Sequence, residues 1–148
     1  MNGVMDMMLV ALDDKAIMPE RAHGADAGLD LFTPVDFVVP AHGYAFVDTG
    51  VRVELPHIDA PYGVDGHVRS KSGLNKNYGL TADGTIDEGY TGSIGITVHN
   101  SGDKAYKFYR GQKVAQLVVE VILRPEPLLV DKVGGGERGD DGFGSTGK

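Results

Sequence analysis

The chain contains no cysteine among its 148 residues. This absence excludes a disulfide scaffold and thiolate metal sites, so nothing in the composition argues for secretion. The five histidines form no pair at the three- or four-residue spacing that is typical of zinc ligands. The first residues, MNGVMDMMLV, lack the basic region and the cleavage pattern of a signal peptide. We therefore expect a cytoplasmic protein.

Long apolar stretches and positive charge are also scarce. The longest nearly apolar run, residues 114–123, is about half as long as a membrane span requires, and Gln116 and Glu120 interrupt it. The formal net charge of −7 disfavours binding to a nucleic acid backbone, because that binding needs clustered lysine and arginine. These features predict neither a membrane nor a nucleic acid partner. A polyphosphate ligand would bring a divalent cation with it.

Helical patterns are nearly missing, whereas alternating patterns and turn residues are frequent. Residues 51–55 and 94–98 alternate between apolar and polar side chains, which predicts half-buried strands. The run 114–123 is β-branched and almost continuous, which favours a strand buried on both faces. Only residues 72–77 favour a short helix. The sequence thus predicts one all-β domain, an antiparallel barrel or jelly roll.

The glycine-rich C-terminus contains groups suited to a nucleotide. Arg138 supplies positive charge, Phe143 offers a face for a base, and Ser145 and Thr146 supply hydroxyls, while the glycines let backbone amides approach phosphate oxygens. An unstructured chain end is the alternative interpretation.

Three consecutive glycines, residues 134–136, predict a hinge before this segment. We therefore divide the chain into a core, residues 1–133, and a C-terminal lid, residues 134–148. The hinge would allow the lid to reach a site on a neighbouring subunit.

The segment GTIDEGYTG, residues 84–92, predicts a hairpin with Asp87 at its tip. Its glycines would bring the backbone close to a neighbour, and exposed backbone groups can pair with the edge of a base. Asp87 there is either a general base or a residue that caps the turn. Tyr90 either packs on a sugar or belongs to the core.

Three further clusters carry polar side chains next to apolar ones. In RSKSGL, residues 69–74, either Lys71 and Ser72 bind an anion, or Ser72 is a helix cap and the cations face solvent. Gln116 interrupts an apolar run and needs a hydrogen-bond partner, which is either a ligand or the backbone. Asp30 lies between apolar residues and requires pairing with a cation or a hydrated metal.

These clusters, in this order, resemble the motifs of the trimeric dUTPases. The resemblance spans residues 27–147. The five matching segments are AGLDL at 27–31, SKSGL at 70–74, GTIDEGY at 84–90, RGQKVAQ at 110–116 and RGDDGFGSTG at 138–147. The resemblance implies a distorted jelly-roll homotrimer with a flexible C-terminal tail. Each of its three active sites would be assembled from all three subunits.

The resemblance also implies hydrolysis of dUTP to dUMP and pyrophosphate by water attack on the α-phosphorus, with Asp87 as the base. Mg²⁺ would bridge the triphosphate, and Asp30 would reach it through water. Tyr90 would lie under the sugar and exclude a ribose. The other residues implied in substrate binding are Lys71, Ser72 and Gly73 for the phosphates, Gly84, Thr85 and Ile86 for uracil, Gln116 for a phosphate oxygen or the attacking water, and Arg138, Phe143, Gly144, Ser145 and Thr146 for the lid.

The chain departs from the family pattern at several positions. Lys71 and Lys113 stand where arginine is usual or common, and a lysine lacks the bidentate fork of arginine for phosphate contact at 71 and for carboxylate pairing at 113. Asp140 and Asp141 place two carboxylates in the lid.

Two alternative functions follow from the same resemblance. The first is a dUTP-binding regulatory module that switches a protein partner, as in some phage members of the family. The second is a dCTP deaminase, which shares the fold. Deaminases carry a glutamate in the strand after the hairpin, and the corresponding residues 93–98 contain no acid.

Overall fold

The computed structural model describes residues 7–144 and residue 147 of the chain. Within these residues the chain forms nine strands and one short helix. In chain order they are β1 Leu9–Leu12, β2 Gly28–Phe32, β3 Phe37–Val39, β4 Tyr44–Glu54, β5 Tyr62–Ser70, α1 Ser72–Tyr78, β6 Leu80–Ile86, β7 Ser93–Asn100, β8 Tyr106–Phe108 and β9 Lys113–Leu123.

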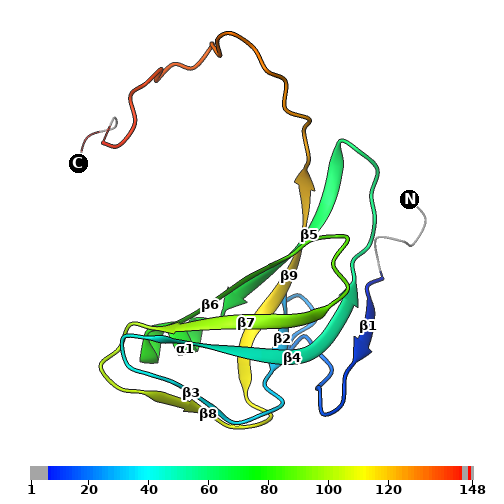
Figure 1. Ribbon diagram of the computed structural model, residues 1–148, viewed down its shortest axis with the longest axis vertical. Helices are drawn as coiled ribbons and strands as arrows, with labels where there is room; N and C mark the ends of the chain where they lie inside the picture. The colour runs from blue at the N-terminus through cyan, green and yellow to red at the C-terminus, as the bar shows by residue number, and fades with distance from the viewer. Residues whose placement is uncertain (1–6, 145–146, 148) are drawn as a thin grey trace.

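Seven strands form one sheet in the order β1-β4-β7-β6-β5-β9-β2, and β3 pairs with β8 in a small second sheet. All neighbouring strands run antiparallel. The large sheet curls, so that β4 and β7 lie across from β5 and β9 (Figure 1). The prediction of an all-β jelly roll is confirmed.

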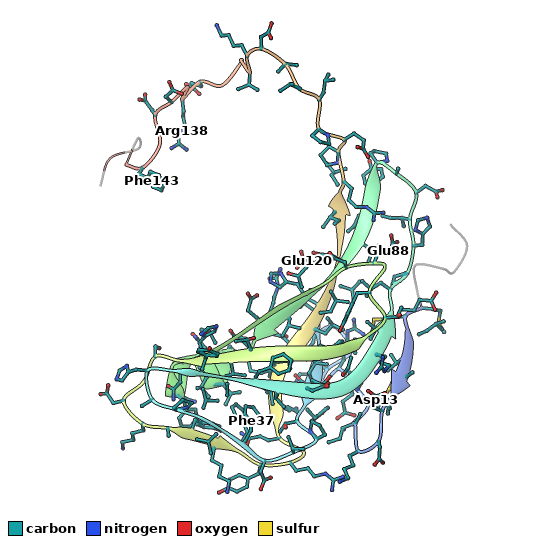
Figure 2. All side chains as sticks on the ribbon, in the orientation of Figure 1. Asp13, Phe37, Glu88, Glu120, Arg138 and Phe143 are labelled. Carbon is teal, nitrogen blue, oxygen red and sulfur yellow. The ribbon has the colours of Figure 1, made fainter. Side chains whose placement is uncertain are left out.

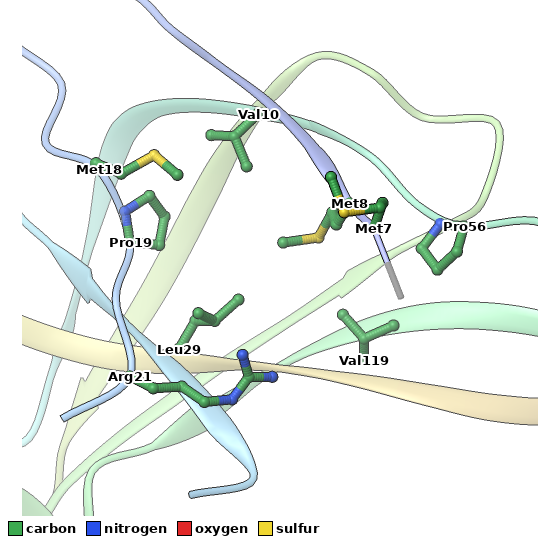
Figure 3. A pocket seen from close by; sticks show the side chains of 9 residues that line it. All are labelled: Met7, Met8, Val10, Met18, Pro19, Arg21, Leu29, Pro56 and Val119. Atoms are coloured by element: carbon green, nitrogen blue, oxygen red, sulfur yellow. The ribbon is translucent and has the colours of Figure 1, made fainter. Parts of the chain in front are cut away.

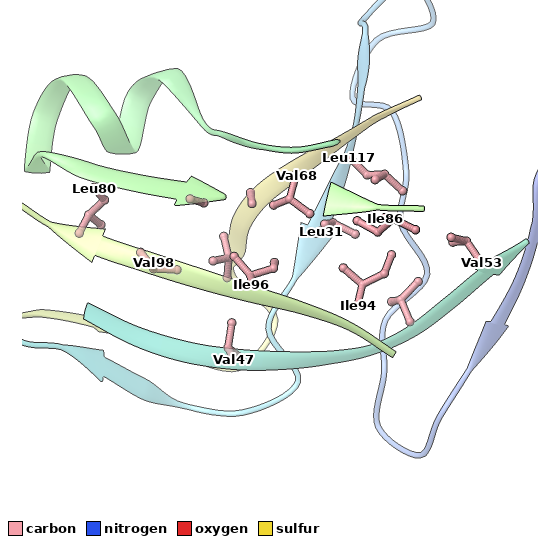
Figure 4. Close-up of a cluster of buried hydrophobic side chains, with 14 of the residues drawn as sticks. Leu31, Val47, Val53, Val68, Leu80, Ile86, Ile94, Ile96, Val98 and Leu117 are labelled. Atoms are coloured by element: carbon pink, nitrogen blue, oxygen red, sulfur yellow. The ribbon is translucent and has the colours of Figure 1, made fainter. Parts of the chain in front are cut away.

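The hydrophobic core fills the concave side of the curled sheet (Figure 4). On β7, Ile94, Ile96 and Val98 are 1%, 0% and 1% exposed, while the residues between them are partly exposed. Val51 and Val53 on β4 show the same alternation. The alternating pattern therefore predicted both half-buried strands correctly, because every second side chain of a strand points to the same face.

The sequence correctly predicted a strand for β9, but only the first half of that strand is buried on both faces. Val114 and Ala115 are both buried where β9 lies between β5 and β2. Val121 and Leu123 near its end are 58% and 64% exposed. The β2–β9 ladder extends only to Val118, so the last part of β9 has β5 as its neighbour on one side alone.

The short helix α1 occupies the position predicted for it. Lys71, in extended conformation, is its N-cap and makes no side-chain capping hydrogen bond, so Ser72 is not the cap. Gly79 ends the helix in the left-handed conformation at φ 69°, and its N–H donates to the Asn75 carbonyl. No helix within the described residues is long and apolar enough to cross a membrane.

After β9 the chain leaves the body. We call residues 124–133 the C-terminal arm and residues 134–148 the lid. The described part of both runs away from the curled sheet (Figure 1). Leu128 and Leu129 on the arm are 83% and 97% exposed. Apolar side chains in this position have no partner within the described part of their own chain.

Candidate active site

Asp30 is the centre of a buried polar cluster that joins three segments. Asp30 is 3% exposed, and it lies on β2 opposite Gln116 of β9. One carboxylate oxygen accepts a hydrogen bond from the Lys71 ammonium, and the other pairs with Lys113 Nζ at 3.0 Å. Of the two partners that the sequence left open for Asp30, the structure shows cations.

The two lysines keep this carboxylate charged. Burial opposes the ionisation of Asp30, but the hydrogen bonds from Lys71 and Lys113 outweigh it, so the pKa of Asp30 lies below its ordinary value. Three charges therefore share this corner of the sheet at neutral pH, with a net charge of about +1. The side chains of Lys71 and Lys113 are 28% and 45% exposed, so water reaches both of them.

Gln116 lies against this cluster because Gly28 leaves room for it. A Cβ atom at position 28 would stand 2.9 Å from Gln116 Cβ and would overlap the side-chain amide oxygen. The amide nitrogen donates to the Ser70 carbonyl at 3.0 Å. The backbone therefore satisfies one end of Gln116, and the other end stays next to Gly28. Nothing in the sequence indicated this role of Gly28 beyond its place in the first motif.

Ser72 and Gly73 begin α1 immediately after Lys71. A pocket of about 390 Å³ opens beside them. Its lining residues are Lys71, Gly73, Leu74, Asn77, Tyr78, Gln112 and Lys113. The added Cβ of an alanine at 73 would meet nothing within 4 Å, so the backbone faces open space there. The first, second and fourth motifs thus meet at one end of the sheet.

Asp87 begins a tight turn between β6 and β7. The Tyr90 N–H donates to the Asp87 carbonyl at 2.9 Å, and the Asp87 side chain is exposed. Tyr90 is 47% exposed rather than part of the core, and its hydroxyl donates to the Ser93 carbonyl at 2.8 Å. Its ring lies over Gly92, where a Cβ atom would stand 2.6 Å from the ring. The side chains of Asp87 and Tyr90 are therefore both accessible to a ligand on the surface of a single chain.

The β6–β7 ladder ends before the segment predicted to recognise a base. Its last pair joins Asp83 and Thr97, one residue before Gly84. A Cβ atom at 84 would stand 3.3 Å from Val68 Cγ2 and 3.4 Å from the Gly95 carbonyl oxygen, so the glycine allows a close approach of strands. Ile86 is 3% exposed and points its side chain into the core, which leaves only its backbone for a ligand. Thr85 is exposed.

The turn and the cluster lie at different ends of the sheet. Ser70 on β5 pairs with Ala115 beside the cluster, whereas Gly66 pairs with Ile86 beside the turn. Four residues of strand span about 13 Å. Asp87 follows Ile86, so a single chain holds it more than a hydrogen bond's reach from a ligand at the cluster.

The described residues of the lid are remote from both places. Arg138 and Phe143 lie on the part of the chain that extends away from the sheet (Figure 2). Arg138 donates to the carbonyls of Asp141 and Gly142 at 3.2 and 3.0 Å, which closes a local turn. Phe143 and Gly144 are exposed. The predicted ligand contacts of Ser145 and Thr146 fall outside the described residues.

A different cavity, of about 280 Å³, lies between β1 and the pair formed by β2 and β9 (Figure 3). Its lining consists of Met7, Met8, Val10, Met18, Pro19, Arg21, Leu29, Pro56 and Val119. Arg21 supplies its single charged side chain, so the cavity lacks the polar groups that hold a nucleotide.

The fold and the two polar sites place the protein among jelly-roll proteins with candidate nucleotide-binding residues at separate ends of one sheet. The dUTPase family model matches residues 14–147. A deoxyuridine 5'-triphosphate nucleotidohydrolase of Alkaliphilus metalliredigens is 39% identical over 139 residues, which cover 92% of this chain and 93% of that protein. The chain belongs to the dUTPase family.

Solved structures of phage enzymes share the fold. The dUTPase of Staphylococcus bacteriophage 80alpha with dUPNHPP superposes with a TM-score of 0.84 at 30% identity, covering 97% of this chain and 99% of that one. A mutant dUTPase of phage phi11 of S. aureus, whose structure concerns the coordination of a structural Mg(II) ion, gives 0.73 at 30% identity, covering 85% and 97%. The resemblance stated from the motifs is thus confirmed at the level of family and fold.

Proposed function

We propose that this protein is a dUTP diphosphatase, which hydrolyses dUTP to dUMP and pyrophosphate. The observation that carries the proposal is the family match across residues 14–147, which includes every motif and the acid on the β6–β7 turn. Relatives that match over more than nine-tenths of the chain are named deoxyuridine 5'-triphosphate nucleotidohydrolases.

Asp87 serves as the general base in this reaction. It orients a water molecule and takes its proton as the water oxygen attacks the α-phosphorus, and pyrophosphate leaves from the opposite side. The exposed position of Asp87 on a turn supports this role, because the carboxylate is accessible to a substrate that a neighbouring subunit holds. Positioned groups of this kind typically contribute about 10²- to 10⁴-fold to the rate.

The phosphates bind at the cluster end of the sheet. Gly73 lines the open pocket and Ser72 precedes it at the start of α1, and Lys71 and Lys113 give that pocket a positive wall. Lys71 is held by Asp30, so it acts as a fixed charge at the edge of the site. Gln116 Nε2, which donates one N–H to the Ser70 carbonyl, has a second N–H for a phosphate oxygen, and its amide oxygen can accept a hydrogen bond from the attacking water.

Magnesium accompanies the triphosphate and belongs to the substrate. The described residues contain no group of three or more metal-ligating side chains, and both oxygens of Asp30 already face ammonium groups. Such a site is better suited to an ion that arrives bound to the phosphates than to an ion that the protein holds by itself. The ion would neutralise phosphate charge, and the contact of Asp30 with its hydration shell stays a prediction.

Three copies of the chain share each site. Within one chain the turn and the cluster lie about 13 Å or more apart along β5, and the lid, as far as the structure describes it, extends away from both. A trimer brings the cluster of one copy, the turn of a second and the lid of a third together. Arg138, Phe143, Gly144, Ser145 and Thr146 then close over the γ-phosphate and the uracil. The exposed apolar arm, with Leu128 and Leu129, supplies contacts between copies.

Base and sugar are selected at the turn. The backbone of Gly84, Thr85 and Ile86, beyond the end of the β6–β7 ladder, matches the carbonyl and N–H pattern of uracil. Close walls exclude the methyl group of thymine. Tyr90, fixed by its hydrogen bond to Ser93, lies under the sugar and leaves no space for a 2′-hydroxyl.

A regulatory role is the second candidate. The neighbour from Staphylococcus bacteriophage 80alpha is described as one of the phage dUTPases that control transfer of virulence genes by a G protein-like mechanism. If this chain acts in that way, it binds dUTP without needing to cleave it. The dUTPase family match and the lack of an acid in residues 93–98 favour hydrolysis of dUTP over deamination of dCTP. The cytoplasmic location stays a prediction from the sequence.

The test is pyrophosphate release from dUTP, dCTP, dTTP and UTP with Mg²⁺. The intact chain is compared with Asp87→Asn and with a truncation after Gly136. We expect cleavage of dUTP alone, with a loss of at least about 10²-fold in Asp87→Asn and a large loss in the truncated chain. Binding of dUTP without cleavage of any nucleotide would replace the hydrolase with the regulatory module.

A further inference from the structure

Glu88 follows the proposed base and is far less exposed than its neighbours on the turn. It is a central residue of the turn that the Tyr90 N–H closes on the Asp87 carbonyl. Its side chain is 17% exposed, although Asp87 beside it is exposed. A carboxylate buried to this extent at the tip of a hairpin requires partners.

Both oxygens of this carboxylate are engaged by segments far away in the sequence. Oε1 lies 2.8 Å from His57 Nδ1, and Oε2 lies 3.1 Å from Arg124 Nη2. His57 belongs to the connection between β4 and β5, and Arg124 follows the last residue of β9. Figure 2 shows Glu88 beside the upper ends of β5 and β9. We call these three residues the Glu88 clamp.

His57 is held in place by the residues around it. Leu55 and Ile58 on either side are 5% and 6% exposed and belong to the hydrophobic core. Pro56, the residue before His57, further restricts the backbone. The imidazole therefore projects from a segment that is anchored in the core, so its contact with Glu88 fixes the turn relative to the body.

Arg124 is fixed as firmly as His57. Its backbone N–H donates to the Pro61 carbonyl at 2.8 Å. Its guanidinium occupies the space above Gly63, where a Cβ atom would stand 2.8 Å from Cζ and would overlap Nε. Arg124 also begins the C-terminal arm, so the clamp joins the turn that carries Asp87 to the root of the segment that carries the lid.

The charges of the clamp agree with its geometry. The hydrogen bond and the charge of Glu88 raise the pKa of His57, and Asp59 on the same loop, 3.4 Å from Nε2, adds to this effect. The hydrogen bond from His57 lowers the pKa of Glu88 despite its partial burial, and Arg124 lowers it further. Glu88 is thus an anion between two cations in the lower part of the neutral range.

From this geometry we propose that Glu88 is a positioning residue, which holds Asp87 in place for attack through His57 and Arg124. The proposal rests on the hydrolase function proposed above. Glu88 does not touch the substrate, and its role is to fix the turn whose first residue is the base. An error of about 1 Å in the position of a catalytic group costs up to about 10²-fold in rate. The proposed uracil contacts of Gly84 to Ile86 lie on β6, and Tyr90 keeps its own hydrogen bond to Ser93, so loosening Glu88 should act more on the chemical step than on binding.

The experiment compares kcat and KM for dUTP in the wild-type chain, in Glu88→Gln and in Asp59→Asn. Glu88→Gln keeps the shape of the side chain and removes its charge. Asp59→Asn is the matched control, because it removes the other carboxylate near His57. The Asp59 side chain is 98% exposed. We expect Glu88→Gln to lower kcat about tenfold with KM within about threefold, since only transition-state positioning is lost. The control should stay within about twofold of wild type in kcat.

The outcomes separate this proposal from the proposed function. A wild-type chain that does not hydrolyse dUTP overturns both. An active wild type with an unchanged kcat in Glu88→Gln, or with a loss that is confined to KM, overturns the clamp alone. If Glu88→Gln does not fold, Arg124→Gln and His57→Gln each remove one partner, and each should lower kcat by a smaller factor than tenfold. Wild-type kcat in both would overturn the proposal.

The pH profile gives a second readout that a merely structural role would not move. The groups that face His57 are Glu88 from the turn and Asp59 from its own loop, with Arg124 on the far side of Glu88. Because the pKa of His57 is raised, its positive charge is present at low pH and is lost as the pH rises through that raised value. The ratio of kcat between wild type and Glu88→Gln should therefore shrink from about pH 6 to about pH 9. A ratio of kcat that stays constant over this pH range would overturn the proposed role of His57 in holding Glu88.

Discussion

At the scale of single residues, Gly28 shows how the absence of a side chain can position a functional one. Its missing Cβ lets the Gln116 side chain lie against β2, while the Gln116 amide nitrogen donates to the Ser70 carbonyl of β5 on the other side of β9. Glycine in a strand costs stability, and a close approach of another group is a common reason for its presence. Here the approaching group is a proposed ligand of the phosphates.

Replacing Gly28 by alanine should therefore damage the site, and it also forces a shift between β2 and β9. The new Cβ would stand 2.9 Å from Gln116 Cβ and 3.0 Å from Cδ, so the side chain must move and lose its hydrogen bond to Ser70. A lost hydrogen bond of about 1 kcal/mol, with the displacement of the amide, predicts roughly a tenfold loss of kcat/KM for dUTP. Steady-state kinetics on the purified variant would measure this.

Gly24→Ala is the matched control. A Cβ at position 24 would meet nothing within 4 Å, and this glycine precedes the same strand. Its kcat/KM should equal that of wild type. An unchanged kcat/KM in Gly28→Ala would show that Gln116 adjusts without loss and has no positional role.

Residue types were easier to predict from the sequence than residue partners. The need of Asp30 for a counter-ion followed from its apolar neighbours, and the structure supplies Lys71 and Lys113. Which cation would pair with it did not follow, because Lys71 is 41 residues away in the chain. The position of Glu88 between His57 and Arg124 left no mark in the sequence for the same reason.

At the scale of elements, Asp30 fastens three of them. It joins β2 to Lys113 at the start of β9 and to Lys71, which caps α1. Removal of one member of a buried ion pair costs about 3–5 kcal/mol, and the partial exposure of both lysines reduces this to roughly 1–3 kcal/mol, because water can solvate them. We expect Asp30→Asn to lower the free energy of unfolding by that amount at neutral pH.

The pH dependence of this loss has a definite sign. The pKa of Asp30 is lowered in the folded protein, so its contribution is present above its ordinary value of 3.8 and disappears as the pH falls through the lower folded value. The difference between wild type and Asp30→Asn should thus be full near neutrality and shrink below about pH 4. Urea unfolding of both proteins at several pH values would measure it, and a difference that grows in acid would contradict the ion-paired state.

Elements whose pattern was strong were predicted well, and those whose burial depends on distant neighbours were not. The alternation on β7 and the second half of β4 predicted buried and exposed faces correctly. The apolar run of β9 predicted a strand but not its exposed end, since Val121 and Leu123 lie beyond the β2 ladder. That end leads directly into the arm, for which we proposed contacts with a second copy of the chain.

At the scale of the whole molecule, the separation of the site residues is the main feature. The sequence placed the motifs in order along the chain but contained no distances between them. In the structure, one end of the sheet holds Asp30 and its lysines, the other end holds Asp87, and the described part of the lid reaches neither. A single copy is therefore an incomplete enzyme if the proposed function is correct.

Mixing two inactive variants tests this arrangement directly. Asp87→Asn has an intact lid without a base, and the truncation after Gly136 has an intact base without a lid. If the turn and the lid of each site come from different copies, a random mixture has about one quarter of its sites complete, because half of the chains supply each intact part. Subunits exchanged by joint unfolding and refolding should thus recover about a quarter of the wild-type rate of pyrophosphate release. Recovery no greater than the sum of the separate variants would mean that one copy supplies both the turn and the lid, which would contradict the shared site even if dUTP hydrolysis itself is confirmed.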